Sequence, residues 1–398
     1  MVVSPKRPTP DVECATTEIV RRASVRSNHQ GAVSYLAKTL GGDLGQVMLF
    51  IDPEADFDRI ISEADEAFAP ASVIACTTAG EIGVEGYTDG EIVAIGFPAQ
   101  HFMVSTLLIT DLDKLRSHDV IGEVIRTRMA LDARTPHFPH AFAFVMVDGL
   151  SRCEDQLMSC LASGLSTLPV FGGSAGDGVR FENTRISIDG SCYRNAAIVS
   201  FVRTDCPVRV FSLNHLDPGT ERMVVTKANP SHRMVQEINA RPAAREYARI
   251  LGKNPDFLSQ FTFAAHPLVV RVGGQHHVRA IQRVTEDGAL VFFSAIDEGI
   301  VLTLAKVGDI AAHLDAAMED ISGDGEVDMI LACDCLLRRI EATQKQAARD
   351  MSGTLVKNRV MGFNTYGEQV GAKHVNQTMT GVAIYAPISA FAPVNRQD

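Results

Sequence analysis

The sequence predicts an α/β fold of two domains, in which repeated units of strands and helices form helix-backed sheets and the second half carries an antiparallel insert. Two observations support this prediction. A pattern of strand, helix, strand, Gly-acidic loop and strand occurs three times, and a β-rich segment separates the second copy from the third. With 398 residues, 46% of them apolar and 21% charged, the chain has a globular composition and the length of two or three domains.

The first copy begins with the apolar run 47–51, which we expect to be a buried strand. Asp52 and Pro53 follow it as the predicted N-cap and first residue of a helix. Apolar residues recur at helical spacing over 57–68 and predict the buried face of that helix. The unit continues with strand 72–76, the loop 77–81 and strand 91–97.

The second copy has the same order of elements. Its strand 141–147 precedes a helix in which Ser151 and Glu154 fit a capping box. The copy is completed by strand 169–173, the loop 174–177 and strand 197–202.

The third copy is looser, and its helix is polar. Its elements are strand 327–333, a helix through Ile340 and Ala347, strand 359–363, the loop 364–368 and strand 379–385. In every copy an Asp ends the first strand and an acid closes the loop. The separations are 29 residues from Asp52 to Glu81, 29 from Asp148 to Asp177, and 34 from Asp334 to Glu368. This spacing indicates a repeat.

The segment 210–325 does not follow the repeat. It predicts a short helix around 241–247, and then antiparallel strands at 267–272, 278–281 and 290–294 with Gly-Gly and Asp-Gly turns. We therefore divide the chain near residue 210. The predicted organisation is a polar arm at 1–28, an α/β domain at 29–209, a second at 210–390, and a tail at 391–398.

Charge and cysteine usage limit the functional classes. The net charge of −11 argues against nucleic-acid binding, which needs clustered Lys and Arg. No apolar run is long enough for a membrane span, and the first residues do not form a signal peptide. The eight cysteines lack the paired spacing of a structural zinc site. Isolated cysteines of this kind are typical of small core residues in a reducing compartment. We expect a cytoplasmic protein.

The Gly-acidic loops lie within longer strings of distinctive sequence. Two of these strings are Cys-Thr-Thr-Ala-Gly-Glu-Ile at 76–82 and Phe-Gly-Gly-Ser-Ala-Gly-Asp-Gly at 171–178. The others are 89–97, 241–247, 295–299 and 362–368. Together they resemble the FIST family of sensory proteins, through both its FIST N and its FIST C domain, over about residues 30–388.

The resemblance implies a ligand-sensing module of bacterial signal transduction that is not an enzyme. One subgroup of the family consists of haem-bound nitric-oxide sensors that regulate a partner histidine kinase. No output domain is recognisable in the sequence. If the chain signals, we expect it to act through a histidine kinase or another output protein.

The three loops are candidate ligand sites, because the N–H groups of a Gly-rich loop can hold an anion and its carboxylates an amino group. The alternative is structural: glycine permits a tight turn and the acid caps the following backbone. The candidate ligand-binding residues are Thr78, Gly80, Glu81, Gly173, Ser174, Gly176, Asp177, Tyr366, Gly367, Glu368 and Asn376.

The haem subgroup implies an axial ligand, and His374 has the most suitable setting. It lies just before a strand, among polar residues able to fix an imidazole tautomer, so it is the candidate metal ligand of haem b. Arg180 and Arg185 are placed to balance propionates, and His232 to face a pocket between the halves. The alternative interpretation of His374 is a histidine that only forms hydrogen bonds within its loop. The alternative for the two arginines is an ordinary role at the protein surface.

Two other functions stay open. A FIST sensor could bind a small organic ligand, such as an amino acid, without haem. A serine hydrolase would use Ser174, since 172–176 reads Gly-x-Ser-x-Gly, but no helical pattern follows as that motif requires. Finally, we expect Cys333 and Cys335 at a buried strand end, and Arg338 and Arg339 in solvent.

Overall fold

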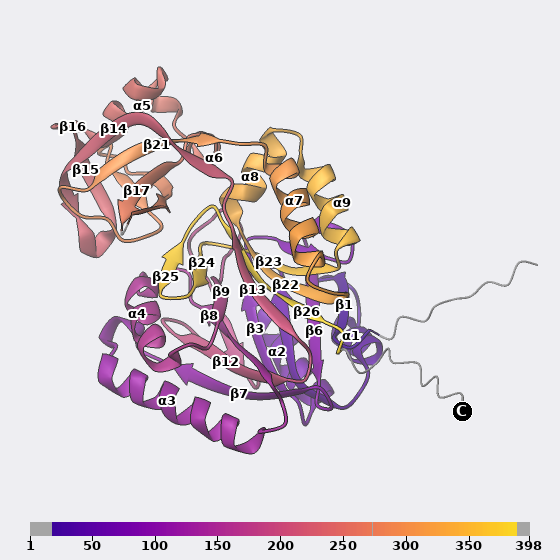
Figure 1. The fold of residues 1–398 in the computed structure, drawn as a ribbon. Coiled ribbons are helices and arrows are strands. Elements are labelled where there is room, and N and C mark those ends of the chain that lie inside the picture. Colours follow the sequence, from indigo (N-terminus) through magenta and orange to yellow (C-terminus); the bar gives the residue numbers. More distant parts are fainter. Residues whose placement is uncertain (1–17, 273, 388–398) are drawn as a thin grey trace, which may run out of the picture.

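The computed structural model describes residues 18–272 and 274–387 and confirms the α/β fold. The chain forms three similar units and an insert (Figure 1). The first unit contains β1 (Arg21–Arg26), α1 (Ala32–Leu40), β2 (Leu44–Ile51), α2 (Phe57–Phe68), β3 (Ser72–Thr77), β4 (Glu81–Gly83), β5 (Gly86–Thr88) and β6 (Glu91–Pro98). Its leading strand and helix extend the repeat beyond the predicted pattern.

The second and third units repeat this order. The second contains β7 (Phe102–Ile109), α3 (Ser117–Arg134), β8 (His140–Val147), α4 (Glu154–Leu165), β9 (Val170–Ser174), β10 (Ile186–Ile188), β11 (Ser191–Tyr193) and β12 (Ala197–Thr204). The third contains β13 (Val208–Leu213), α7 (Ile310–Ser322), β22 (Val327–Cys335), α8 (Leu336–Gln344), α9 (Ala348–Lys357), β23 (Val360–Thr365), β24 (Glu368–Val370), β25 (Lys373–Val375) and β26 (Met379–Tyr385). The insert separates β13 from α7.

Each unit builds one sheet and gives a hairpin to another. The sheet orders are β1-β6-β2-β3-β10-β11, β7-β12-β8-β9-β24-β25 and β13-β26-β22-β23-β4-β5. The hairpin of the first unit thus completes the third sheet, that of the second completes the first, and that of the third completes the second. This closed exchange makes the three sheets one interlocked body.

The inner faces of the three sheets share one hydrophobic core. Phe50 of β2, Phe144 of β8 and Phe363 of β23 meet there, and the rings of Phe50 and Phe363 stack with centroids 4.4 Å apart. The outer faces are covered by α1 and α2, by α3 and α4, and by α7, α8 and α9, respectively (Figure 1). Because the central strands are buried on both faces, their sequences are continuous apolar runs.

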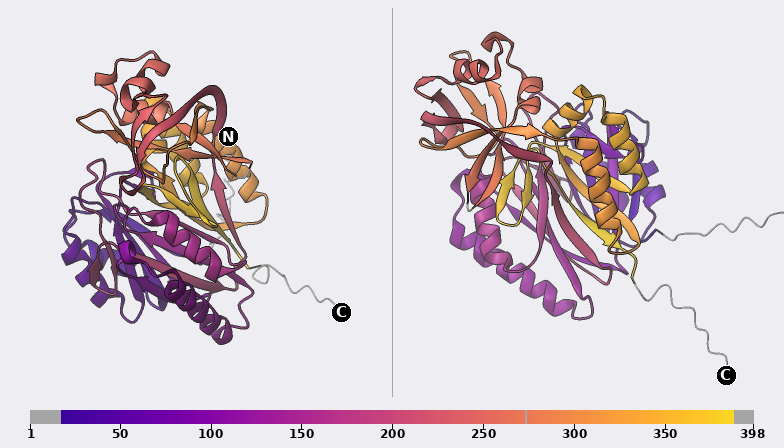
Figure 2. Two further views of the ribbon diagram at one scale, coloured as in Figure 1. Left: turned by 90° about the vertical axis from the view of Figure 1, so that its left-hand side faces the viewer. Right: turned by 45° about the horizontal axis from the view of Figure 1, so that its top comes forward.

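The insert, residues 214–309, forms a separate lobe with its own core (Figure 2). Its main elements are β14 (Leu216–Asn229), β15 (Met234–Ile238), β16 (Arg241–Pro242), α5 (Ala243–Leu251), α6 (Gln260–Ala265), β17 (Leu268–Val272), β18 (Gln275–Arg279), β19 (Ile281–Val284), β20 (Leu290–Phe292) and β21 (Val301–Val307). These strands pair antiparallel, as predicted.

Part of the predicted N-terminal arm is docked on the body. Strand β1 pairs with β6, and the Asp328 carboxylate accepts the N–H groups of Ile19 and Val20 at 2.9 and 2.8 Å. Residues 1–17 of the arm and the tail 391–398 lie outside the described residues. Among the described residues, no helix is both long and apolar enough to cross a membrane.

The predicted start of the first helix was wrong. Helix α2 begins at Phe57, because the Asp56 side chain accepts the Arg59 N–H at 3.2 Å and caps it. Asp52 instead accepts the Ser27 hydroxyl at 3.1 Å and opens a turn.

Two other helix predictions were also wrong. Helix α4 begins at Glu154, so Ser151 lies before it, and Glu154 binds Arg233 of the insert instead of completing a capping box. The single polar helix of the third unit is two helices. Gln346, between α8 and α9, has a φ of +58°, a left-handed conformation that ends a right-handed helix.

Candidate ligand-binding site

The first Gly-acidic loop is held together by the buried Glu81 carboxylate. The Thr78 hydroxyl donates to one carboxylate oxygen at 2.5 Å, and the Glu91 N–H donates to the other at 3.2 Å. Gly80 has a φ of +130°, and its missing side chain leaves space for the Arg339 guanidinium. These contacts fit the structural interpretation of this loop.

The third loop has the same arrangement around the buried Glu368. Its carboxylate accepts the Thr365 hydroxyl, and also the N–H and hydroxyl of Thr378 at 3.3 and 2.6 Å. Gly367 lies directly against the His374 ring, so a side chain there would clash. Burial raises the pKa of Glu368 to about 8, and of Glu81 in the first loop likewise to about 8.

The second loop differs, because its acid caps a following turn. Asp177 accepts the N–H groups of Phe181, Glu182 and Asn183 at 2.8, 2.9 and 2.7 Å. It also accepts the Tyr366 hydroxyl, which joins the second loop to the third. Asp177 is only 1% exposed, so its carboxylate is committed to these donors.

Ser174 does not have the geometry of a nucleophile. It is fully buried, and its hydroxyl accepts the Gln369 Nε2 hydrogen bond at 3.0 Å. Gly173 and Gly176 are buried beside it, and Gly176 packs against Ala79 of the first loop. The nucleophile elbow instead needs an exposed hydroxyl at a strand-to-helix turn.

His374 is buried in strand β25. Its Nδ1 lies 3.2 Å from Gln369 Nε2, and its buried Nε2 has no partner in the described part of the chain. Burial lowers the pKa of His374, so the imidazole is neutral, the state that binds metals. Asn376 is also buried and donates to the Tyr366 carbonyl at 3.3 Å. The Gly367 backbone packs closely against the side of the ring that carries Nε2.

Arg180 and Arg185 each contact a carboxylate of the first unit. Arg180 pairs with Glu54, and Arg185 pairs with Asp58 at 2.8 Å. Both arginines line a surface hollow of about 330 Å³ beside the loop after β3. Among the described residues, neither arginine forms a hydrogen bond or an ion pair with His374.

A second cavity, of about 200 Å³, lies between the second unit and the insert. It opens beyond the carboxyl ends of the parallel strands β8 and β9, where ligands bind in open α/β sheets. Arg180 and His232, two of the predicted cofactor-binding residues, both line it. Phe181, Phe292 and Phe293 supply an apolar surface.

The charged side chains that line this cavity are all arginines. Arg152 and Arg180 come from the second unit, and Arg233 and Arg283 from the insert, together with His232. The described lining residues include no Asp or Glu. Ion pairs of the described residues engage Arg180 and Arg233, but neither Arg152 nor Arg283. The cavity therefore offers guanidinium donors that suit a carboxylate or another anion.

Arg233 also fastens the insert to the second unit. It is 5% exposed and pairs with Glu154 at 2.5 Å and with Asp155 at 3.4 Å, both at the start of α4. Its guanidinium further donates to the Phe293 carbonyl. The cavity thus adjoins a buried ionic contact between the two lobes.

Sequence reasoning missed Arg152, Arg233 and Arg283. They lie in three separate segments, with no motif around any of them. The other two basic lining residues gave a signal: His232 precedes a predicted helix, and Arg180 follows the second Gly-acidic loop. These arginines come together because the insert packs against the second unit. Short sequence motifs do not reveal that packing.

Comparison with known families agrees with this architecture. The FIST N domain model matches residues 45–241, and the FIST C domain model matches residues 243–371. No curated protein matches the chain. FIST domains are sensory domains of signal transduction that bind small ligands. The two matches together cover most of the sequence, and the chain belongs to the FIST family.

Proposed function

We propose that the chain is a sensor that binds a small organic anion, such as an amino acid held by its carboxylate, in the cavity between the second unit and the insert. The observation that carries this proposal is the lining, with four arginines, one histidine and no acid among its described residues. A volume of about 200 Å³ is below the roughly 300–1,000 Å³ of drug-sized sites, which favours a ligand of few heavy atoms.

Ligand binding would shift the equilibrium between different arrangements of the second unit and the insert. The cavity is lined from both lobes, so an anion would bridge Arg152 of the second unit and Arg283 of the insert. The ligand would favour the conformation in which these arginines converge, and shift the population toward it. We propose that a histidine kinase or another output protein recognises that conformation, in the reducing cytoplasm where the described cysteines are free.

A thermal-shift panel tests the proposal. Amino acids and dicarboxylates should raise the Tm, because a ligand that binds only the native state adds about 2.7 kcal/mol at a hundred times its Kd. Their amides should not. Arg283→Gln should reduce the shift, and Arg271→Gln, an exposed insert arginine outside this cavity, should preserve it. Equal shifts in both variants, or with the amides, would contradict this site.

Haem b with nitric-oxide sensing is the second candidate, and the unpartnered Nε2 of His374 favours it. Haem would supply an iron that binds diatomic gases. However, His374 is 4% exposed and the Gly367 backbone lies directly against its ring, so the residues as arranged leave no room for haem beside Nε2. We therefore derive no step through haem.

An absorbance spectrum of the purified protein after adding haem decides between the candidates. A sharp Soret band that shifts with nitric oxide and disappears in His374→Ala would favour haem. A band that the mutation does not affect would move the search to His232, the other histidine among the candidate cofactor residues. The absence of a specific band leaves the organic anion as the proposed ligand.

A further inference from the structure

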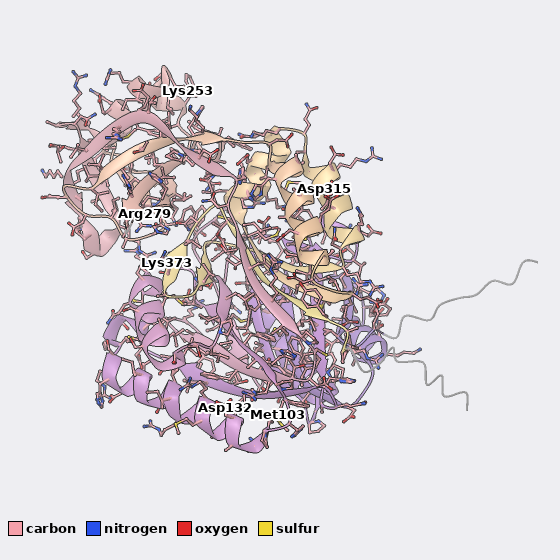
Figure 3. The ribbon with its side chains drawn as sticks, in the orientation of Figure 1. Met103, Asp132, Lys253, Arg279, Asp315 and Lys373 are labelled. Carbon is pink, nitrogen blue, oxygen red and sulfur yellow. The ribbon has the colours of Figure 1, made fainter. Side chains whose placement is uncertain are left out.

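The connections between units bring three potential metal ligands together. His101 lies in the turn between β6 and β7, and Asp205 and Cys206 lie between β12 and β13. Strands β7 and β12 are antiparallel, and Phe102 pairs with Thr204, so the two turns meet at one edge of the second sheet. Figure 3 labels Met103, two residues after His101, near this edge.

The ligand atoms are close enough to share one ion. His101 Nδ1 lies 3.1 and 3.0 Å from the two carboxylate oxygens of Asp205, and Cys206 Sγ lies 3.5 Å from Asp205 Oδ1. All three ligand atoms lie within 4.8 Å of one another. Tetrahedral zinc with bonds of about 2.0–2.3 Å places its ligands about 3.3–3.8 Å apart, so only small movements are needed.

We propose that His101, Asp205 and Cys206 bind one zinc ion, with water in the fourth position. Imidazole nitrogen, carboxylate and thiolate are the ligands that zinc takes in proteins. The backbone already fixes both turns: the Cys206 N–H donates to the Thr204 hydroxyl at 3.0 Å, and the His101 N–H donates to the Pro98 carbonyl at 3.1 Å. The ion would join the two connections between units.

Zinc binding by this site must release a proton. Burial raises the pKa of the Cys206 thiol to about 12, and the carboxylates of Asp205 and Asp328 oppose its ionisation. The thiol is therefore protonated without metal. Zinc forms a bond to sulfur and displaces that proton, because the cation supplies the local positive charge. Zinc binding should not depend on the organic-anion cavity.

Titration of the full chain with Co²⁺ tests the site, since thiolate bound to cobalt gives a charge-transfer absorption band. The background should be Cys14→Ser, because Cys14 lies outside the described residues. We expect a band that saturates at one equivalent and is displaced by Zn²⁺. Cys206→Ser should abolish it, and Cys192→Ser, which removes an exposed cysteine, should leave it intact.

The buried Cys206 variant could fail to fold, so His101→Asn provides a second test at a half-buried position. It should abolish or displace the band while the circular dichroism spectrum stays native. No band in the parent, or an unchanged band in a natively folded Cys206→Ser or His101→Asn variant, would overturn the proposal. The three residues would then form an ordinary His–Asp contact beside a core thiol.

Discussion

Arg338 is a fully buried charge at the start of α8. Its Nε donates to Asp334 Oδ1 at 2.7 Å, and its Nη1 lies 2.8 Å from His215 Nδ1. The prediction that Arg338 lies in solvent was wrong. Helix α8 follows β22 without a loop, so the position four residues after the strand-end Asp334 points into the protein.

Removing this guanidinium should be costly. Arg338→Met leaves the buried Asp334 without its cation, and we expect a loss of about 3–5 kcal/mol in the free energy of unfolding. The matched control is Arg59→Met, because Arg59 and Glu63 form an exposed pair with the same 2.7 Å distance and spacing of four residues. The control should lose at most about 1 kcal/mol in urea denaturation. Equal losses of unfolding free energy in the two variants would contradict the role of Arg338 as the buried cation that neutralises Asp334.

The loop acids predict a pH dependence of stability. Burial raises the pKa of Glu368 to about 8, whereas a glutamate in the unfolded chain titrates near 4.3. The folded state binds more protons between these values. The free energy of unfolding should therefore fall as pH rises through this window, by at most about 1.4 kcal/mol per pH unit for this group.

Substitution isolates this effect. Glu368→Gln imitates the protonated carboxyl and should flatten the fall in stability, whereas Glu182→Gln, at an exposed position, should leave it unchanged. Denaturant titrations at several pH values provide the measurement. A profile that is equally steep in Glu368→Gln and in the parent would contradict a proton held at Glu368.

At the scale of elements, α8 and the adjoining Lys345 form a clamp on the two chain segments that connect the insert to the body. Glu341 contacts His215 Nε2 at 2.9 Å in the outgoing linker, and Lys345 donates to the Gly308 carbonyl at 3.0 Å in the returning one. Gly308 also donates its N–H to the His215 carbonyl. These contacts fix how the insert leaves the body.

Loosening this clamp should increase local opening without unfolding the body. Lys345→Met should speed amide hydrogen exchange at the first residues of β14 and the last residues of β21, because these strands adjoin the linkers. Lys357→Met, at the end of α9, should leave those amides unchanged. Faster exchange throughout the body would show that the effect is global.

The strands and helices whose apolar residues form a long, recognisable pattern were predicted from sequence. The three-residue strands of the hairpins were not predicted. The central strands and α2 were found, because apolar runs and helical spacing mark them. The hairpins β4–β5, β10–β11 and β24–β25 have strands of only three residues, and each pairs with another unit. Two arginines of the candidate cavity were missed for a related reason, since Arg152 and Arg283 are 131 residues apart in sequence.

At the scale of the whole molecule, the hairpin exchange ties the halves together across residue 210. Hairpin β4–β5 completes the sheet of the third unit, and β24–β25 completes that of the second. The division of the chain near residue 210 stays a prediction from sequence, and strands pair across it. Cooperative folding of the full chain follows from this interlocking.

Dividing the chain tests the interlocking. Fragments 1–207 and 208–398 each lack a hairpin of one sheet and expose part of the shared core. We expect each alone to bind a hydrophobic dye and to lack a cooperative unfolding transition, and the mixture to regain one. A cooperative transition of 1–207 alone, similar to that of the full chain, would contradict the account.

Anion binding between the lobes is best tested by calorimetric titration of the protein with the carboxylate that most raises its Tm. The titration is repeated with the double variant Arg152→Gln/Arg283→Gln. These arginines line the cavity from opposite lobes. A hydrogen bond to a charged group contributes about 1.5–3 kcal/mol. We therefore expect the double variant to bind the carboxylate at least about tenfold more weakly. An unchanged Kd would contradict binding in this cavity.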